Sequence, residues 1–258
     1  VNMIYLSKKK RRMWLLWTIP AISLVACLIV WVYWFSSEGW NTFERTETLT
    51  VLDQVSQDAS TIGRTAFYSS ITPGEGLHFS AETEVTPEVE VNSWMRDSSA
   101  RTVHWSQDQH LARGWITARV PAHFVLRKTS VSVLERVRIT FEDDGEGTAL
   151  NGLGATIQKL TVCDHQGEIY EATNLAPGSS VKLTRTERTA SGSHSALRDV
   201  YESTRWERAA KDVREEPEKY LQPGRYIATL GRSPFLKSAL GGASNEDLKT
   251  VVYGIYKR

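Results

Sequence analysis

Residues 157–174 read IQKLTVCDHQGEIYEATN, and this stretch decides the fold class. Ile157–Cys163 and Glu168–Asn174 are two runs rich in β-branched and aromatic residues, and the polar tetrapeptide Asp164–Gly167 separates them. Runs of this kind, joined by a short loop that contains glycine, are typical of a β-hairpin. We therefore predict two antiparallel strands joined by a turn at 164–167.

Similar short runs occur on both sides of this hairpin. Most alternate apolar with polar residues, or are rich in valine, threonine and aromatic residues, which favours strands. The predicted strands are 48–51, 64–68, 77–81, 84–91, 115–120, 123–126, 130–141, 180–183, 225–230 and 250–256. Short strands with turn signals between them, such as Thr72–Gly76, predict a mainly β chain built as an antiparallel β-sandwich.

The acidic, glycine-rich segment 142–154 interrupts the strand pattern. We predict a β-rich domain over 36–145 and a second β-rich subdomain over 146–258, and the sequence leaves open whether these are one domain or two. The second part contains one amphipathic helix at about 195–216, because its apolar residues follow a helical stripe and Pro217 ends it.

The run Met13–Phe35 contains no charged residue over 23 positions. At about 1.5 Å per helical residue, it is long enough to cross a bilayer core of ~30 Å. Aromatic residues mark both of its ends, as expected at the lipid headgroups: Trp14, Trp17, Trp31, Tyr33 and Trp34. We predict a single transmembrane helix over 13–35 that acts as a signal-anchor.

Five basic residues directly precede this run: Lys8, Lys9, Lys10, Arg11 and Arg12. Because positive charge stays on the cytoplasmic side of a span, residues 1–12 are expected to form a cytoplasmic tail, with the chain from about residue 36 outside the cytoplasm. A rival interpretation makes Leu24–Cys27 a lipoprotein cleavage site with Cys27 lipidated. The residues after Cys27 stay apolar, which favours an intact span.

The exported part has features typical of a bacterial envelope protein. It contains one cysteine, Cys163, so no internal disulfide is possible there, and no asparagine of the chain begins an N-x-Ser/Thr acceptor. The predicted location is therefore the inner membrane, facing the periplasm. Outside residues 1–35, 26 basic residues oppose 30 acidic ones, and this balance argues against nucleic-acid binding.

Three weak groupings could carry chemistry. His104, Asp108 and His110 lie within seven residues and are candidate metal ligands, although their spacing matches no standard motif and a polar loop or sheet edge is favoured. Cys163 and His165 would form a thiol site only if their side chains met. The acidic loop 142–146 misses the calcium-binding register. Phosphate-binding glycine loops and nucleophile elbows are absent from the sequence.

Exposed tryptophans could alternatively bind envelope glycans by stacking on sugar rings: Trp40, Trp94, Trp105, Trp115 and Trp206. We expect most of them to be core residues. The sequence therefore favours a membrane-anchored, extracytoplasmic β-domain that acts as a non-catalytic accessory or scaffold. Its expected partners are the lipid bilayer and other membrane or envelope proteins, with no cofactor. An envelope enzyme with a metal or thiol site, and a glycan-binding module, are the alternatives.

Overall fold

The computed structural model describes residues 15–38, 42–72, 74–88, 101–131, 134–142, 145–189, 211, 213–215, 217–240 and 245–256. The chain divides into two compact units, residues 1–41 and residues 42–258. The boundary follows the change from a continuous apolar run to alternating strand sequence.

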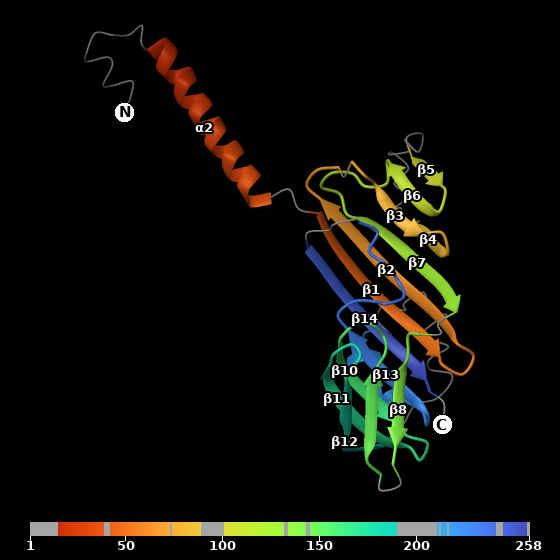
Figure 1. Cartoon of the computed structure of the whole chain (residues 1–258). Coiled ribbons are helices and arrows are strands. Elements are labelled where there is room, and N and C mark those ends of the chain that lie inside the picture. The colour runs from red at the N-terminus through yellow and green to blue at the C-terminus, as the bar shows by residue number, and fades with distance from the viewer. Residues whose placement is uncertain are drawn as a thin grey trace. The chain divides into compact units, whose positions relative to one another are not determined.

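Helix α2 (Leu15–Glu38) belongs to the first unit (Figure 1). Its 24 residues overlap the helix predicted over 13–35, and Pro20 lies in the second turn, close to the end where a missing amide donor costs least. Over the described residues, no helix combines the length and the mean hydropathy of a membrane span. A helix is therefore present here, but the predicted transmembrane assignment is not supported.

The second unit is mainly β, as predicted. Its large sheet contains β1 (Thr42–Asp53), β2 (Asp58–Ser69), β4 (Thr83–Glu88), β7 (Ala122–Val131), β8 (Val137–Phe141), β9 (Gly147–Asn151), β10 (Ile157–Cys163), β11 (Glu168–Leu175), β12 (Ser180–Thr189), β13 (Arg225–Leu230) and β14 (Asn245–Ile255). A smaller sheet contains β3 (Leu77–Ser80), β6 (Asp108–Arg113) and β5 (Thr102–Trp105). A short 3-10 turn, η3, covers Pro217–Lys219.

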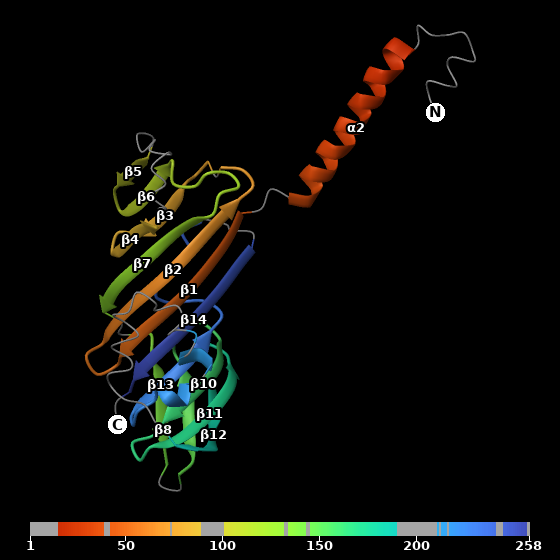
Figure 2. The same ribbon diagram turned by 180° about the vertical axis from the view of Figure 1, so that it is seen from behind.

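The order of the large sheet is β4-β7-β2-β1-β14-β13-β10-β11-β12-β9-β8. Figures 1 and 2 show the long strands β7, β2, β1 and β14 side by side. Neighbouring strands run antiparallel, except that β1 and β14 pair in parallel with Phe43 opposite Asn245. The prediction of an antiparallel sheet was wrong for this pair, because a partner about 200 residues away leaves no local pattern.

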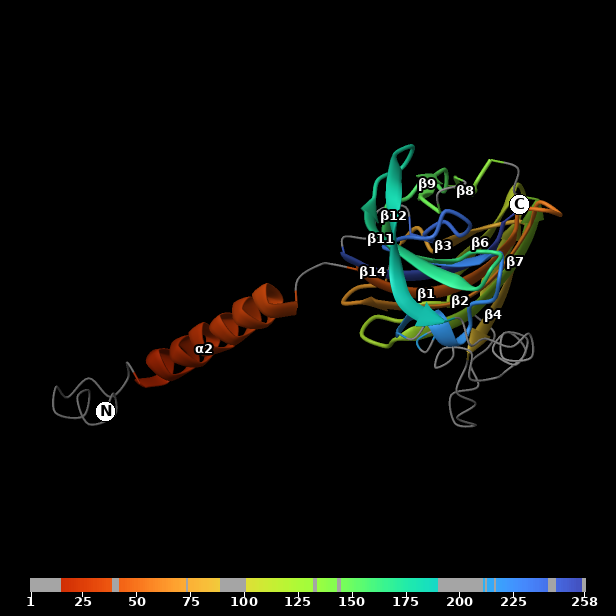
Figure 3. The same ribbon diagram turned by 90° about the horizontal axis from the view of Figure 1, so that it is seen from below.

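Strand β12 turns the sheet back over itself (Figure 3). Its first residues, 180–183, pair with β9, and its later residues, 184–189, pair with β11. Side chains from β8 and β9 therefore pack against those of β10 and β13 in one buried cluster, which includes Val137, Ala149 and Leu160. This arrangement gives the sandwich-like packing that the sequence predicts.

The smaller sheet packs on the opposite end of the large one. Leu77 and Phe79 of β3 and Leu111 of β6 contact Phe67 and Phe124 of β2 and β7 in a second buried cluster. Because strand residues alternate between faces, burial of these three side chains turns His78 and His110 to the outer face. The small sheet thus presents one polar face away from the core.

Several local predictions were wrong. Residues 115–120 form turns, with Arg119 at a φ of 64°, and the predicted strand 130–141 is two strands with a break after Val131. The segment 142–154, predicted to interrupt the strand pattern, contains strand β9 over Gly147–Asn151. Most of the predicted helix 195–216 lies outside the described residues, although 213–215 are helical. Strands from both predicted regions, 36–145 and 146–258, share the large sheet, and the division into subdomains stays a prediction.

Candidate functional site

The outer face of the small sheet places three histidines in a row. His110 of β6 lies directly opposite His78 of β3 and also directly opposite His104 of β5. Residues that are cross-strand partners share a face and bring their Cβ atoms to about 5 Å. Asp108, two residues before His110, lies on the same face. The register therefore gathers all three predicted metal candidates and adds His78.

The imidazole rings are in close contact. The rings of His78 and His110 stack, with centroids 4.1 Å apart and planes 11° from parallel. The ring of His104 lies 5.8 Å from that of His110 at 38°. Among the side chains that the structure describes, no three His, Cys, Asp or Glu groups converge as they lie in a way that could hold a metal ion. The row is stacked rather than convergent.

Hydrogen bonds orient two of these rings. Nδ1 of His78 lies 2.8 Å from Oδ2 of Asp108, and Nε2 of His110 lies 2.8 Å from the backbone oxygen of Glu75. A carboxylate and a carbonyl only accept hydrogen bonds, so both ring nitrogens must be the protonated ones. The bond from His78 lowers the pKa of Asp108 below its usual value. The carboxylate is therefore held in its charged form.

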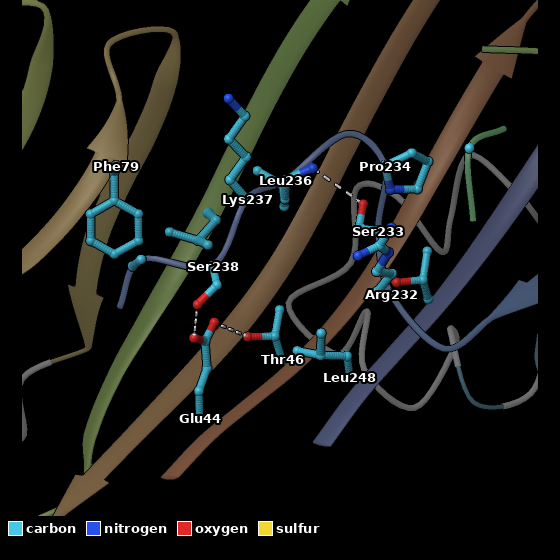
Figure 4. Close-up of a pocket in the computed structure, with 14 residues that line it drawn as sticks. Glu44, Thr46, Phe79, Arg232, Ser233, Pro234, Leu236, Lys237, Ser238 and Leu248 are labelled. Atoms are coloured by element: carbon cyan, nitrogen blue, oxygen red, sulfur yellow. Dashed lines mark hydrogen bonds between the residues drawn. The ribbon is translucent and has the colours of Figure 1, made fainter. Parts of the chain in front are cut away.

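A separate cavity of about 350 Å³ lies between the large sheet and residues 232–239, which cross it as a strap (Figure 4). Glu44 of β1 is 4% exposed. Its carboxylate accepts hydrogen bonds from the hydroxyls of Thr46, at 3.0 Å, and Ser238. These hydroxyls give the buried carboxylate hydrogen-bond partners and tie the strap to the sheet, so we assign Glu44 a structural role. The sequence did not indicate that Glu44 is buried, because a glutamate in a strand pattern is expected to face solvent.

The thiol grouping does not assemble. Cys163 is fully buried, and burial raises its pKa to about 11, so its thiol stays protonated at neutral pH. His165 packs beside Tyr256, with ring centroids 5.4 Å apart, and the Cys163 sulfur instead lies 3.5 Å from the backbone oxygen of Asp164. These neighbours offer the thiol no base.

The described tryptophans of the second unit differ in environment. Trp105 is 70% exposed at the end of β5. Trp115 is half-buried; its indole N–H donates to the backbone oxygen of Thr102 at 3.0 Å, and the guanidinium of Arg101 lies 5.1 Å from its ring. Trp40, Trp94 and Trp206 lie outside the described residues. A groove lined by two exposed tryptophans is not found among those described.

The predicted anchor residues are only partly described. Trp17, Trp31 and Tyr33 are exposed on α2, and Cys27 is an exposed free cysteine on the same helix. Trp14 and the basic residues 8–12 lie outside the described residues, as does the side chain of Trp34.

Comparisons with known proteins identify distant structural matches. No family model matches the chain, and no curated protein matches it. Among solved structures, the yeast delta-COP-I mu-homology domain matches at 7% identity with a TM-score of 0.34, covering 83% of this chain and 95% of that chain. The same domain complexed with a Dsl1 WxWxV peptide matches at 6% identity with a TM-score of 0.31, covering 83% and 96%. Likeness at this level carries no functional inference.

Proposed function

We propose that the chain is a membrane-tethered binding module, in which α2 holds the chain in a lipid bilayer and residues 42–258 bind another membrane or envelope protein without catalysis. In this proposal residues 1–12 face the cytoplasm and the β-rich unit lies on the other side. The observation that carries it is the exposure of large apolar side chains along α2: Trp17, Ile22, Leu24, Val25, Leu28, Ile29, Val30, Trp31, Val32 and Tyr33, each at least half exposed.

Water is a poor environment for such a helix. Transfer of each large apolar side chain out of water is favourable by about 1.5–3 kcal/mol of free energy. At ~1.5 Å per residue, a helix of 24 residues measures about 36 Å, against a bilayer core of ~30 Å. The lipid part of the proposal rests on this exposure and on the charge-free run 13–35 of the sequence.

Membrane fractionation tests the anchor. Replacing Leu24 and Leu28 together with lysine places two charges one turn apart near the middle of α2, at a cost of about 2.5–3.5 kcal/mol each. We expect the wild-type chain, and the Ser36→Lys control at the helix end, to stay in membranes after an alkaline wash, and the double variant to be released. Recovery of the intact, unacylated wild-type chain in the supernatant contradicts the proposal.

A point variant and a reporter fusion separate the rival topologies. Cys27→Ser leaves a transmembrane anchor unchanged, whereas it releases a lipoprotein whose anchor is the acylated cysteine. A reporter fused after residue 258 is expected to be active only outside the cytoplasm. Cytoplasmic activity of that reporter contradicts the proposed orientation.

An exposed apolar patch at one end of the β-rich unit supports binding of a protein partner. Val55 lies in the β1–β2 turn, and Val131 lies opposite Asp58 at the end of that hairpin. Leu134 follows three residues later, and these three aliphatic side chains are 60–81% exposed. Patches of this kind mark contact sites for other proteins.

Position-specific cross-linking tests this surface. We expect a photo-reactive residue at 131 or 134 to give one defined adduct with a membrane protein in intact cells. The same residue at Thr173, which is exposed on β11 far along the sheet order, serves as the control. Equal labelling at 131 and 173, or no adduct at 131, rejects the patch as the contact surface.

A further inference from the structure

A second group of exposed apolar side chains lies at the end of the large sheet where β1 begins. Phe43, Ile71 and Val120 are 41%, 46% and 52% exposed. Tyr68 lies opposite Phe43 in the β1–β2 register, and the centroids of their rings are 6.3 Å apart. Pro121 follows Val120 and lines one groove with Phe43 and Tyr68. We call these five residues the β1-start patch.

Hydrogen bonds hold the loops of this patch against the strand end. The backbone N–H of Arg119 donates to the backbone oxygen of Ser69, the last residue of β2, at 2.8 Å. The hydroxyl of Ser69 donates to the backbone oxygen of Ile71 at 2.5 Å. These contacts fix the backbone beside Ile71 and Val120, so both apolar side chains are presented at a defined place.

The cation nearest to Phe43 along β1 is paired with carboxylates. Arg45 lies two residues after Phe43, on the same face of the strand. Its Nη2 lies 3.1 Å from Oε1 of Glu47, and its Nε lies 3.6 Å from Oδ2 of Asp247. We therefore expect burial of apolar surface, rather than attraction to anionic groups, to dominate binding at the β1-start patch.

Chain connectivity identifies the occupant. Helix α2 ends at Glu38 and β1 begins at Thr42, and at about 3.5 Å per extended residue this connection reaches at most ~14 Å. In the proposed function α2 leaves the bilayer at this end, so the start of β1 stays within reach of the lipid headgroups. Tyrosine rings are favoured at headgroup level, and exposed apolar patches mark membrane contact sites. The occupant that fits this patch is therefore the bilayer surface.

We infer that the β1-start patch contacts lipid in the headgroup region of the bilayer that holds α2. This inference rests on the proposed function, which supplies the bilayer. Strand β1 runs from Thr42 to Asp53, and at about 3.3 Å per residue its ends lie ~36 Å apart. The patch formed by Val55, Val131 and Leu134 lies at the other end of β1. Lipid contact at the β1-start patch thus leaves that second surface available to a protein partner.

Fluorescence quenching of the full chain tests the contact. The Cys27→Ser chain is reconstituted in phosphatidylcholine nanodiscs, and an NBD fluorophore is attached to one introduced cysteine, while the buried Cys163 stays unlabelled. We expect labels at Ile71→Cys and Val120→Cys to be quenched by a lipid that carries a nitroxide near its headgroup. Both labels should also be several-fold less accessible to aqueous iodide than a label at Val131→Cys, because interfacial side chains lie about 5–10 Å into the headgroup boundary.

Val131 is the matched control, because it is also an exposed valine but lies opposite Asp58, near the far end of β1. Adding Val120→Asp to the chain labelled at 71 should lower the lipid quenching of that label several-fold, whereas adding Val131→Asp should leave it unchanged. A label at Ile29→Cys in α2 reports on the anchor separately. Thermal unfolding of each labelled chain separates a lost contact from a lost fold.

The label in α2 distinguishes failure of this inference from failure of the proposed function. Lipid quenching at 29 without lipid quenching at 71 and 120 overturns the inference and leaves the anchor intact. Equal lipid quenching at 120 and 131 also overturns it, as does shielding from iodide at 71 and 120 without lipid quenching, which would show that protein covers the patch. A label at 29 that is quenched by iodide alone overturns the proposed anchor, and the inference with it.

Discussion

Thr48 and Thr250 share a hydrogen bond between their side-chain hydroxyls, 3.0 Å from oxygen to oxygen, although 202 residues separate them. Both side chains are buried, and the bond joins β1 to β14, the parallel pair of the large sheet. Thr50 pairs with Thr61 of β2 in the same way, at 2.9 Å. The threonine hydroxyls on this face of the sheet therefore hydrogen-bond one another in pairs across strands. This pairing lowers the free-energy cost of burying them.

Removing one member of such a pair should cost more than removing both. We expect Thr48→Val to lower the free energy of unfolding by about 1–3 kcal/mol, because the hydroxyl of Thr250 loses its partner in a buried position. The double variant Thr48→Val with Thr250→Val should recover much of this loss, since both polar groups are then gone. Urea unfolding followed by circular dichroism measures each value.

The control for this cycle is Thr140→Val on the exposed face of β8, which should change stability by less than about 0.5 kcal/mol. If the double variant loses the sum of the two single losses, the two hydroxyls do not act as a pair.

Gly254 is expected to tolerate no side chain. A Cβ at this position would overlap the ring of Tyr226, which is fully buried and whose hydroxyl accepts a hydrogen bond from the amide of Gln54 at 2.8 Å. We predict that Gly254→Ala destabilises the fold by about 3 kcal/mol, because overpacking displaces a ring that has no room to move. Gly74→Ala, where nothing lies within 4 Å, should leave the melting temperature nearly unchanged. Similar melting temperatures for the two variants would show that the Tyr226 ring can move aside.

The Cys163 thiol should be inert in the folded chain. With its pKa raised to about 11 by burial, iodoacetamide should label it only after unfolding at pH 8, in a Cys27→Ser background read by mass spectrometry. The raised pKa also predicts a pH effect. Between about pH 9 and 11 the unfolded chain loses this proton while the folded chain retains it, so the stability due to this group falls as pH rises. Rapid labelling of the folded chain would contradict this placement.

The bond between His78 and Asp108 should be visible in the titration of the carboxylate. Because His78 lowers the pKa of Asp108, the His78→Phe variant should raise that pKa toward its ordinary range. The stability that this bond contributes is present above the ordinary carboxylate pKa, and it is lost as pH falls through the lowered value. Carbonyl ¹³C NMR of Asp108 measures the shift, with His123→Phe as the control; an unchanged pKa in His78→Phe would count against the bond.

Local pattern predicted those parts of the fold whose partners are close in sequence. The hairpin over 157–174 forms as expected, with Val162 opposite Tyr170, because a four-residue turn joins its strands and brings them directly together. Residues 115–120 show where this reasoning fails. They resemble a strand in composition, yet Arg119 adopts a positive φ in a turn. Residue composition alone does not specify the backbone dihedral angles at each position.

The candidate site shows the same limit. The sequence alone brought His104, Asp108 and His110 together, because they lie within seven residues. His78 could not be added, because its distance in sequence from His110 says nothing about register, and a shift of one residue would turn it into the core.

The sequence by itself determined that the chain is mainly β and that residues 13–35 form a long apolar run, because residue alternation and continuous hydrophobicity are patterns among neighbouring residues. Tertiary structure alone decided that β1 lies parallel to β14, that Glu44 and the threonines beside it are buried, and that three imidazoles share one face. These features depend on contacts between residues far apart in the chain, and such contacts form only when the whole sheet closes and its register is fixed.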